Sequence, residues 1–400
     1  MKEGWTYKKL GELCEIFGRI GFRGYTKSDL VNSPEDGAIT LSPSNIIDGE
    51  MNYGKCSYIT WAKYEESPEI KIYPGDILLV KTASVGKTAL VKYLPHKATI
   101  NPQLVVLKKI SINNEFLSYY LKSEKAQNFI WSIAKGAAAQ TVSQKNLAEM
   151  IVPNPALSEQ QRVVSRLDAA FSHIDELKVN AEKQLSEARA LFQKSLAKAM
   201  KPKEGWKEKK LIEITHEKCP ISYGIVQQGN HIDGGVPVVR PVDMREKYIT
   251  RENLKCTTQT ISDSYKRTIL RGDELLLSVR GTTGIISLAT PELKGCNVNR
   301  GIVPLYFKDQ FNKDFLYYEM VSPILQSVFA EKTTGSTLKQ INIKDLRLIK
   351  LSLPPLSEQQ RIVERLDALS AHVRELEENQ KKIISECDAL KQALLRKVFE

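Results

Sequence analysis

The chain has 400 residues, which is more than one hydrophobic core usually holds, so two or three folding units are expected. Its 42% hydrophobic and 26% charged residues are typical of a folded globular protein and exclude a disordered chain. Lys and Arg number 58 against 47 Asp and Glu, and the formal net charge of +11 favours polyanionic partners, either nucleic acid or an acidic membrane surface.

The opening stretch, MKEGWTYKKLGELCEI, lacks the apolar segment of a signal peptide, and no run of about 18 apolar residues occurs. We therefore expect no export, no membrane insertion and a cytoplasmic location. The six cysteines are scattered without a CxxC pair, and the five histidines are dispersed. This argues against a zinc site or a redox motif, so no metal-binding residue is predicted.

The first globular part combines short apolar runs with frequent Gly, Pro, Asn and Ser. The runs DILLV at 76–80 and QLVVLKKI at 103–110 predict strands. The segment FLSYYLKSEKAQNFIWSIA at 116–134 has the length and apolar spacing of one helix. These elements predict a mixed α/β domain over residues 1–156.

A proline-marked stop, IVPNPA at 151–156, precedes a segment over 157–200 that has no proline or glycine. Ser158 is expected to be the N-cap of a helix, with Gln161 three residues later completing a capping box. The sequence therefore predicts one long helix over residues 157–200.

The second half of the chain repeats the first. LSEQQRVVSRLD at 157–168 returns as LSEQQRIVERLD at 356–367 with ten of twelve residues unchanged, and offsets between other matching strips stay between 197 and 201. The runs ELLLSV at 274–279 and GIVPLYF at 301–307 predict strands of a second mixed domain over 201–355. A second long helix is predicted over 356–400, with Ser357 and Gln360 in the capping positions.

Apolar residues recur every seven positions along both predicted long helices, which is typical of a coiled-coil seam. A helix cannot bury such a narrow apolar stripe alone, and the nearest element that could cover it is the other long helix. Rods of roughly 60 Å that pair antiparallel would leave one domain at each end, whereas parallel pairing is harder to close. Independent helical tails on two loosely linked domains are the alternative. The expected seam consists of Leu167, Ala170, Ile174, Leu177, Ala181, Gln184, Ala188 and Leu191 with Leu366, Leu369, Val373, Leu376, Gln380, Ile383, Cys387, Leu390 and Leu394.

Motifs of catalysis are incomplete or missing. NPQL at 101–104 lacks the second proline and the aromatic residue of an adenine methyltransferase loop. KTASVGKT at 81–88 has Lys81 where a phosphate-binding loop requires glycine. PEIK at 68–71 is the only hint of a nuclease carboxylate cluster and has no counterpart in the second half. Neither HExxH nor a Ser-His-Asp order occurs, so no catalytic residue is predicted.

Polar loops recur at equivalent places in both halves while their residues differ, which is typical of two readers of different DNA sequences. Arg and Lys contact phosphates, and Asn, Gln, Ser and Thr hydrogen-bond to base edges. For any single residue, an ordinary solvated role stays open. The predicted DNA-contacting residues are Arg19, Arg23, Lys27, Ser42, Ser44, Asn45, Lys81, Ser84, Lys87, Gln140, Gln144 and Lys145 in the first half, and Gln227, Gln228, Asn230, Arg240, Arg245, Arg280, Thr282, Thr283, Asn299, Arg300, Lys339, Gln340 and Asn342 in the second.

The chain resembles the specificity (S) subunit of type I restriction-modification systems over essentially its full length. The resemblance rests on the order domain, helix, domain, helix and on three stretches. These are KQINIKDLRLIKLSLPPLSEQQRI at 339–362, GDELLLSVRGTTG at 272–284 and YGIVQQGNHIDGGVPVVRPVDM at 223–244. The first half departs more, with GDILLVKTASVGKT at 75–88 in place of the glycine-threonine loop.

The resemblance implies an α+β fold with two mixed α/β target recognition domains, separated by two long helices that form an antiparallel spacer with pseudo-two-fold symmetry. It implies a non-catalytic subunit that reads the two halves of a split, asymmetric site in double-stranded DNA. Its expected partners are two modification subunits, which use S-adenosylmethionine to methylate a flipped-out adenine, and two restriction subunits, which use ATP and Mg²⁺. This chain would bind none of these cofactors itself.

Two other classes of protein remain as alternatives. An enzyme with a degenerate nuclease or nucleotide site in the first half would cleave DNA or hydrolyse nucleotide as the purified chain alone. A coiled-coil adaptor with an incidental basic face would lack the steep salt dependence of affinity that a DNA reader shows.

Overall fold

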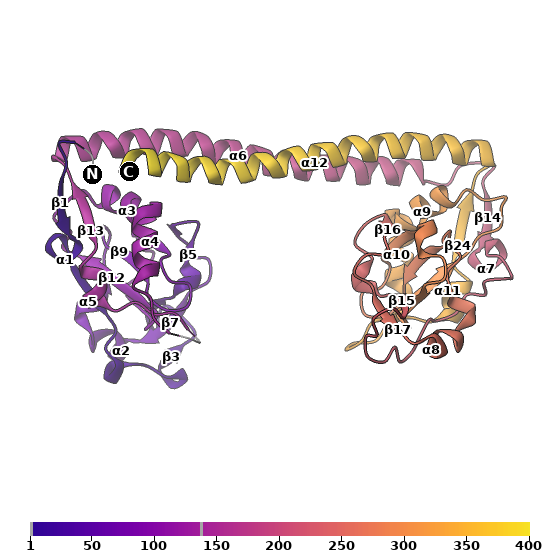
Figure 1. Cartoon of the computed structure of the whole chain (residues 1–400), viewed down its shortest axis with the longest axis horizontal. Coiled ribbons are helices and arrows are strands. Elements are labelled where there is room, and N and C mark those ends of the chain that lie inside the picture. The colour runs from indigo at the N-terminus through magenta and orange to yellow at the C-terminus, as the bar shows by residue number, and fades with distance from the viewer. Residues whose placement is uncertain (1–2, 137–138) are drawn as a thin grey trace. The chain divides into compact units, whose positions relative to one another are not determined.

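The computed structural model describes residues 3–136 and 139–400, and the chain divides into two compact units (Figure 1). Unit 1 comprises Met1–Glu182 and Lys381–Glu400, and unit 2 comprises Lys183–Gln380. Each unit contains one mixed α/β domain and part of both long helices, α6 (Leu157–Ala199) and α12 (Leu356–Phe399). The predicted fold class, two mixed domains with two long helices, is confirmed.

Two sheets form most of the first domain. One has the strand order β10-β9-β12-β2 with antiparallel neighbours, and the other has the order β3-β7-β4-β11-β8 with β4 and β11 parallel. Every residue of β9 is buried, as its continuous apolar run predicts. The strands are β1 (Thr6–Lys9), β2 (Glu15–Gly18), β3 (Leu30–Val31), β4 (Gly37–Leu41), β5 (Ile46–Ile47), β6 (Glu50–Met51), β7 (Ser57–Thr60), β8 (Lys71–Ile72), β9 (Ile77–Val80), β10 (Thr88–Leu90), β11 (Ala98–Ile100), β12 (Leu104–Lys108) and β13 (Ile151–Asn154).

The second domain has the same kind of architecture. A sheet of order β16-β19-β18-β21 lies beside one of order β17-β15-β20, and β14 pairs with β24 as β1 pairs with β13. The predicted strands at 274–279 and 301–307 are confirmed as β18 and β21. The strands are β14 (Lys207–Lys210), β15 (Val236–Val239), β16 (Tyr248–Ile249), β17 (Lys255–Thr257), β18 (Leu275–Ser278), β19 (Ile286–Ala289), β20 (Asn297–Val298), β21 (Ile302–Leu305), β22 (Thr333–Thr334), β23 (Gln340–Ile341) and β24 (Lys350–Leu353).

Short helices flank the sheets, and one prediction about them is wrong. The segment 116–134 does not form a single helix, because Ser123 has an extended backbone and divides it into α3 and α4. The buried Ser123 hydroxyl donates to the Tyr120 carbonyl and caps α4 by accepting the Ala126 N–H. Ser322 divides α9 from α10 in the same way. The short helices are α1 (Leu10–Leu13), α2 (Trp61–Glu65), α3 (Asn114–Lys122), α4 (Glu124–Ser132), α5 (Gln144–Ala148), α7 (Leu211–Ile214), α8 (Gln259–Asp263), α9 (Lys313–Val321), α10 (Pro323–Lys332) and α11 (Ile343–Arg347).

The long helices begin at Leu157 and Leu356, two residues earlier than N-caps at Ser158 and Ser357 would place the first helical residue. In α6 the N–H groups of Glu159 and Gln160 donate to the carbonyl of Ala156, and in α12 the equivalent groups donate to Pro355. Ser158 and Ser357 therefore lie inside the first turn and are exposed, so the predicted caps are wrong. Pro155 follows β13 directly and Pro354 follows β24, and the carbonyls of the next residues, Ala156 and Pro355, accept the first helical N–H groups in place of the serine side chains.

The first Gln of each QQ pair anchors the helix instead. Gln160 is 3% exposed, and its Oε1 accepts the backbone N–H of Asn113, the N-cap of α3, at 2.8 Å. Its Nε2 donates to the carbonyl of Pro155 at 2.8 Å. Gln359 makes the same contacts with Asn312 at 3.0 Å and Pro354 at 2.9 Å. The repeated LSEQQ phrase thus ties each long helix to the short helix α3 or α9.

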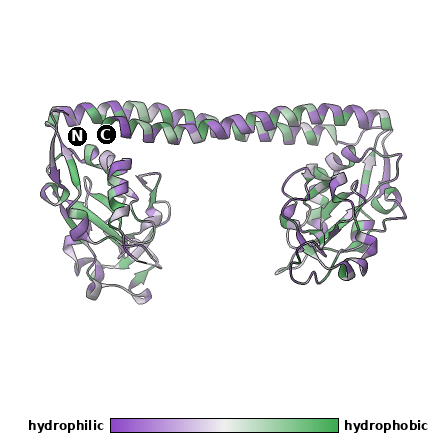
Figure 2. Ribbon diagram, viewed as in Figure 1, coloured by the Kyte–Doolittle hydropathy of each residue, from purple (hydrophilic) through white to green (hydrophobic). Residues whose placement is uncertain are grey.

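The long helices run antiparallel within each unit. In unit 1, Lys178 Nζ of α6 lies 3.0 Å from Asp388 Oδ1 of α12, and Asp175 pairs with Lys391. In unit 2, Arg189 Nε lies 2.7 Å from Glu377 Oε1, and the side chains of Gln184 and Gln380 are hydrogen-bonded at 3.0 Å. Within each unit the residue number rises along one helix as it falls along the other, so the antiparallel prediction is confirmed. Figure 2 shows apolar residues concentrated in the strands and alternating with polar ones along both helices.

The predicted seam alternates between a first heptad position, which holds Leu167, Ile174, Leu366, Val373 and Leu394, and a second one, which holds Leu177, Leu191, Leu369, Leu376, Ile383 and Leu390. The observed seam differs from it at part of the second position. Leu167, Ile174 and Leu366 are buried, and Leu369, Val373, Leu376 and Leu394 are partly buried. The expected seam residues Leu177, Leu191, Ile383 and Leu390 are instead 56%, 57%, 37% and 48% exposed. The reason is that each domain packs against the face four residues after the first seam position, where Phe171 contacts the Tyr119 ring in unit 1 and Phe192 packs on the core of unit 2.

Candidate DNA-binding loops

Two segments of the first domain that are distant in sequence lie side by side, and we call residues 81–88 and 139–145 loop pair 1. The N–H of Ala83 donates to the carbonyl of Gln140 at 3.0 Å, and the N–H of Val142 donates to the carbonyl of Lys81 at 2.8 Å. The hydroxyl oxygens of Thr82 and Thr141 are 2.9 Å apart. This pairing brings together the predicted residues Lys81, Ser84, Lys87, Gln140, Gln144 and Lys145.

The second domain has an equivalent pair, residues 279–284 and 333–342, which we call loop pair 2. The N–H of Gly281 donates to the carbonyl of Lys339 at 2.9 Å, and the N–H of Ile341 donates to that of Val279 at 2.9 Å. The hydroxyl oxygens of Thr283 and Thr333 are 3.0 Å apart. This pairing brings together the predicted residues Arg280, Thr282, Thr283, Lys339, Gln340 and Asn342.

Each loop pair is held by a glutamine that the sequence analysis missed. Gln127 Nε2 of α4 donates to the carbonyls of Gly86 at 2.9 Å and Leu121 at 2.6 Å. Gln326 Nε2 of α10 donates in the same way to Gly284 at 2.9 Å and Met320 at 2.8 Å. Both glycines have positive φ, and a Cβ at Gly86 would lie 2.4 Å from Gln127 Oε1. The 199-residue repeat offset that relates the two glutamines could have revealed them.

The tips of the loop pairs present different polar groups. Ser84, Lys87, Gln140 and Lys145 are exposed in loop pair 1. Thr282, Lys339 and Gln340 are exposed in loop pair 2. Lys81 and Arg280 are half-buried, and burial lowers the pKa of Lys81. Ammonium and guanidinium groups can bind phosphates, and amides and hydroxyls can donate to or accept from base edges.

A further segment of the second domain adjoins loop pair 2. The N–H of Arg300 donates to the carbonyl of Ile225 at 2.7 Å, and the N–H of Val279 donates to that of Gly301 at 2.7 Å. The loop after Ile225 carries two exposed predicted residues, Gln227 and Asn230, and Arg300 is half-buried beside it. In unit 2 the structure thus gathers residues from four parts of the sequence on one loop surface.

Arg19 is not available to DNA in this structure. It is 5% exposed, and its guanidinium donates to the carbonyl of Ile100 at 3.1 Å, the hydroxyl of Thr99 at 3.2 Å and the carbonyl of Arg23 at 3.3 Å. The prediction of a base or phosphate contact there is corrected, because Arg19 fixes the chain before η1 (Gly21–Arg23) to β11.

Four predicted amide side chains serve the backbone instead. Asn45 is 3% exposed and donates to the carbonyls of Asn52 and Lys55, both at 3.0 Å. Asn299 Oδ1 accepts the N–H of Gly301 at 2.8 Å, and Asn342 caps α11. Gln144, with its amide oriented to satisfy both neighbours, donates to Ile16 at 3.2 Å and accepts from Gly18 at 3.0 Å along the edge of β2. Asn299 and Asn342 bond to the backbone two residues later in their own turns, whereas Asn45 and Gln144 bond to the backbone of other segments.

The remaining predicted residues have mixed surroundings. Arg23 pairs with Glu69 at 3.5 Å, and Arg240 pairs with Asp243 at 2.7 Å, which raises the pKa of Arg240. The side chains of Gln228 and Arg245 each donate to a backbone carbonyl at 3.2 Å, and the hydroxyls of Ser42 and Ser44 bond to each other. Lys27 is exposed.

Within residues 3–136 and 139–400, no group of three or more His, Cys, Asp or Glu side chains could hold a metal ion. No helix in that part of the chain is long and apolar enough to cross a membrane.

Comparison with known proteins places these loops in a family context. The chain matches the family described as type I restriction modification DNA specificity domain twice, over residues 2–187 and 203–386. It is 22% identical to the type I restriction enzyme EcoBI specificity subunit of Escherichia coli, covering 99% of this chain and 86% of that protein. It is 25% identical to a putative type I restriction enzyme MjaX specificity subunit of Methanocaldococcus jannaschii, covering 92% and 87%.

Two solved structures share the fold. A chain solved for the complex assembly and conformational transition of the type I R-M system superposes with a TM-score of 0.76 at 22% identity, covering 100% of this chain and 98% of that one. The HsdS subunit from Thermoanaerobacter tengcongensis superposes with a TM-score of 0.55 at 21% identity, covering 99% and 97%.

Proposed function

Because this chain belongs to the family of type I restriction modification DNA specificity domains, we propose that it reads a split DNA site and directs a modification enzyme to it. Loop pair 1 contacts one half of the site, and loop pair 2 contacts the other. The long helices set the distance between the two halves. The chain itself performs no chemistry.

The observation that carries this proposal is the likeness of the two loop pairs. Both are built at the end of a buried strand and are anchored by the equivalent glutamines Gln127 and Gln326. Their exposed tips differ, with Ser84 and Lys87 in the first pair and Thr282 and Lys339 in the second. A common scaffold with different tips supports recognition of two different base sequences.

The partners follow from the family rather than from any site on this chain. We propose that two modification subunits bind S-adenosylmethionine, dock on the helices and domains, and methylate N6 of an adenine that is flipped out of the duplex. Two restriction subunits would use ATP and Mg²⁺. Such a complex acts on cellular DNA, and we place it in the cytoplasm.

The test is to map methylated adenines in DNA from cells that carry this chain with its modification subunit. Arg280→Ala should relax recognition in one half of the methylated site, and Gln140→Ala, an exposed amide of loop pair 1, should relax it in the other half. Lys294→Ala, an exposed lysine outside both loop pairs, is the matched control and should leave the site unchanged. Equal relaxation of both halves by one variant would contradict separate readers.

A further inference from the structure

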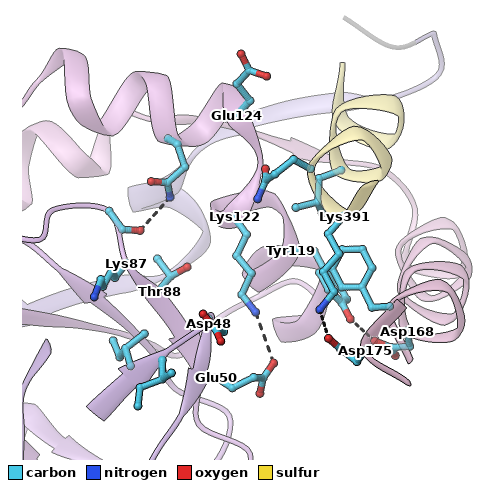
Figure 3. Close-up of a pocket in the computed structure, with 18 of the residues that line it drawn as sticks. Asp48, Glu50, Lys87, Thr88, Tyr119, Lys122, Glu124, Asp168, Asp175 and Lys391 are labelled. Atoms are coloured by element: carbon cyan, nitrogen blue, oxygen red, sulfur yellow. Dashed lines mark hydrogen bonds and ion pairs between the residues drawn. The ribbon is translucent and has the colours of Figure 1, made fainter. Parts of the chain in front are cut away.

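A cleft in unit 1 adjoins loop pair 1, whose residues Lys87 and Thr88 form part of its lining, and it holds side chains of both charges (Figure 3). It lies between the β5–β6 hairpin, helices α3 and α4, and the nearby turns of α6 and α12, with a volume of about 1240 Å³. Asp48 and Glu50 of the hairpin lie on one side, and Asp168 and Asp175 of α6 on the other. Five basic residues, Lys87, Lys92, Lys122, Lys391 and Arg396, line the same cleft, so they balance its five carboxylates, which include Glu124.

Four of the five basic residues that line the cleft are paired with carboxylates of the cleft, and Lys87 has no ion pair among the described residues. Lys122 Nζ lies 3.6 Å from Glu50, and Lys391 pairs with Asp175 while its ammonium lies 5.2 Å from the Phe171 ring centroid. Burial lowers the pKa of Lys122, because a charged ammonium is less stable away from water, and the nearby Glu50 carboxylate opposes this shift.

Two acidic residues of the cleft, Asp48 and Asp168, have no ion pair with a Lys or Arg among the described residues. Asp168 accepts a hydrogen bond from the Tyr119 hydroxyl, a neutral donor. The carboxylate therefore has capacity for a cation.

The equivalent site in unit 2 shows which group binds a carboxylate that accepts a tyrosine hydroxyl. Tyr318 and Asp367 stand 199 residues after Tyr119 and Asp168, and the Tyr318 hydroxyl donates to Asp367 in the same way, at 2.5 Å. Here the ammonium of Lys247 lies 2.9 Å from Asp367 and 3.1 Å from Asp314.

Aromatic rings complete this cation site. The Lys247 ammonium lies 4.8 Å from the ring centroid of Tyr318, 5.1 Å from that of Tyr317 and 5.2 Å from that of Tyr248. Its side chain is 7% exposed. Burial lowers the pKa of Lys247, but the bonds to Asp367 and Asp314 and the nearby Tyr318 outweigh burial and raise it. Unit 2 thus fills the site with its own lysine.

Unit 1 has no lysine at the matching position. Ser42 to Asn45 and Arg240 to Asp243 form equivalent capped turns, and four residues after each turn stand Gly49 in unit 1 and Lys247 in unit 2. Gly49 has a φ of +78°, and a Cβ there would lie 2.9 Å from Cε of Lys122. The Tyr–Asp half of the cation site is retained, and the loop that supplies the lysine in unit 2 carries none. The ammonium of Lys122 lies 5.8 Å from the Tyr119 ring centroid, but it pairs with Glu50 and not with Asp168.

We propose that the cleft of unit 1 receives a lysine or arginine side chain of the modification subunit, which binds Asp168 beside the Tyr119 ring as Lys247 binds Asp367 in unit 2. The identity of the partner rests on the proposed function, and the chemistry of its side chain rests on the duplicated site. A cation held by a carboxylate and an aromatic face gains from both interactions once it is desolvated. Such a contact would make the two units differ, because only the site in unit 1 would bind a side chain of the modification subunit.

Carboxylate labelling tests the contact directly. The full chain, alone and in complex with its modification subunit, is treated with a carbodiimide and glycine ethyl ester, and labelled peptides are quantified by mass spectrometry. We expect Asp168 and Asp48 to be labelled in the chain alone and labelled at least fivefold less in the complex. Protection by DNA without the modification subunit would overturn the proposal, because it would assign the cleft to nucleic acid.

A pair of matched variants gives a second readout. Asp168→Asn keeps an acceptor for Tyr119 and removes the charge, so it should weaken binding of the modification subunit about tenfold without changing thermal stability. Asp367→Asn removes the charge of one of the two carboxylates that bind Lys247, so it should lower the melting temperature and leave that affinity unchanged. If the subunit does not bind the wild-type chain, the proposed function fails together with this inference. If it binds with Asp168 still labelled and Asp168→Asn binds equally well, this inference alone is overturned.

Discussion

The ring of Phe399, at the end of α12, lies 5.4 Å from the ring of Phe116 in α3, measured between centroids. Tyr120 lies at 5.4 Å and Trp5 at 6.5 Å from the same ring, all in edge-on contacts. Phe399 and Leu395 are buried in the cluster that forms the core of the first domain. The long helix α12, which follows the second domain in the sequence, thus completes the hydrophobic core of the first domain.

Phe399→Ala should therefore destabilise unit 1 although it is remote in sequence from most of that unit. Removing a buried phenylalanine from a packed core costs about 3–5 kcal/mol of unfolding free energy. Hydrogen exchange followed by mass spectrometry should show faster exchange in β9 and β12 and unchanged exchange in β18 and β21. Val179→Ala, at a 61% exposed position of α6, is the control. Equal acceleration in both units would contradict a local role.

Gln160→Ala should destabilise the junction between α6 and α3. The variant leaves the N–H of Asn113 and the carbonyl of Pro155 buried without their present partner, which costs about 1–3 kcal/mol for each unsatisfied group. Urea denaturation gives the loss of unfolding free energy. Gln161→Ala, at the exposed neighbouring position, should change it by less than about 0.5 kcal/mol. A similar loss in both variants would show that helix propensity, and not burial, is responsible.

Periodicity and duplication were sufficient to predict the four strands β9, β12, β18 and β21, the two long helices and their antiparallel course. Strands such as β9 and β18 are continuous apolar runs, and their burial depends little on their neighbours. The second seam position could not be predicted, because a heptad pattern does not show which face the domain covers. Phe171 is drawn inward by Tyr119, and Leu177 is left exposed.

Polar residues were harder to assign than apolar ones. Asn45 and Arg19 have the side chains of DNA contacts, yet Asn45 is buried against carbonyls of the hairpin that follows it, and Arg19 against the carbonyl of Ile100 in β11. Such partners follow from tertiary structure and leave no periodic signal. Gln127 and Gln326 were missed for the same reason, although the repeat offset relates them. A polar residue kept at the repeat offset inside a helix is the signal that would have identified them.

Glu319 should make unit 2 less stable as the pH rises. Its side chain is 2% exposed, Oε1 accepts the N–H of Ser352 at 3.2 Å, and Oε2 has no hydrogen-bond partner in the described structure. Burial raises the pKa of Glu319 from 4.5 to about 7. Between these values the folded chain keeps a proton that the unfolded chain loses, so the unfolding free energy falls by about 3 kcal/mol as the pH rises.

The measurement is urea denaturation at pH 5 and pH 8. Glu319→Gln carries no titratable group, so its unfolding free energy should change less between the two pH values than that of the wild type. Glu331→Gln, an exposed position of α10, should retain the full dependence. A dependence that persists in Glu319→Gln would assign it to another group.

Gln326→Ala should loosen loop pair 2, although Gln326 is not one of the residues predicted to contact DNA. The side chain fixes the carbonyl of Gly284, so its loss frees the loop that carries Arg280 and Thr282. Ordering a loop on binding costs affinity, and we expect DNA binding to weaken about tenfold. Methylation mapping should show relaxed recognition in one half of the site. Gln127→Ala should relax the opposite half, and a loss confined to the same half for both variants would contradict the equivalence of the loop pairs.

The salt dependence of DNA affinity separates a DNA reader from a coiled-coil adaptor with an incidental basic face. Each phosphate contact releases a condensed counterion, so the logarithm of affinity falls with the logarithm of salt concentration by about 0.9 per contact. Lys87 and Lys145 are exposed in loop pair 1, and Lys87→Ala with Lys145→Ala should reduce the slope by about 2. Lys183→Ala with Lys382→Ala, on exposed faces of the long helices, should leave it unchanged. A shallow salt dependence of DNA affinity for the wild-type chain would favour the adaptor, and so would a dependence that changes only with the helix lysines. In either case the loop lysines would make no fixed phosphate contacts.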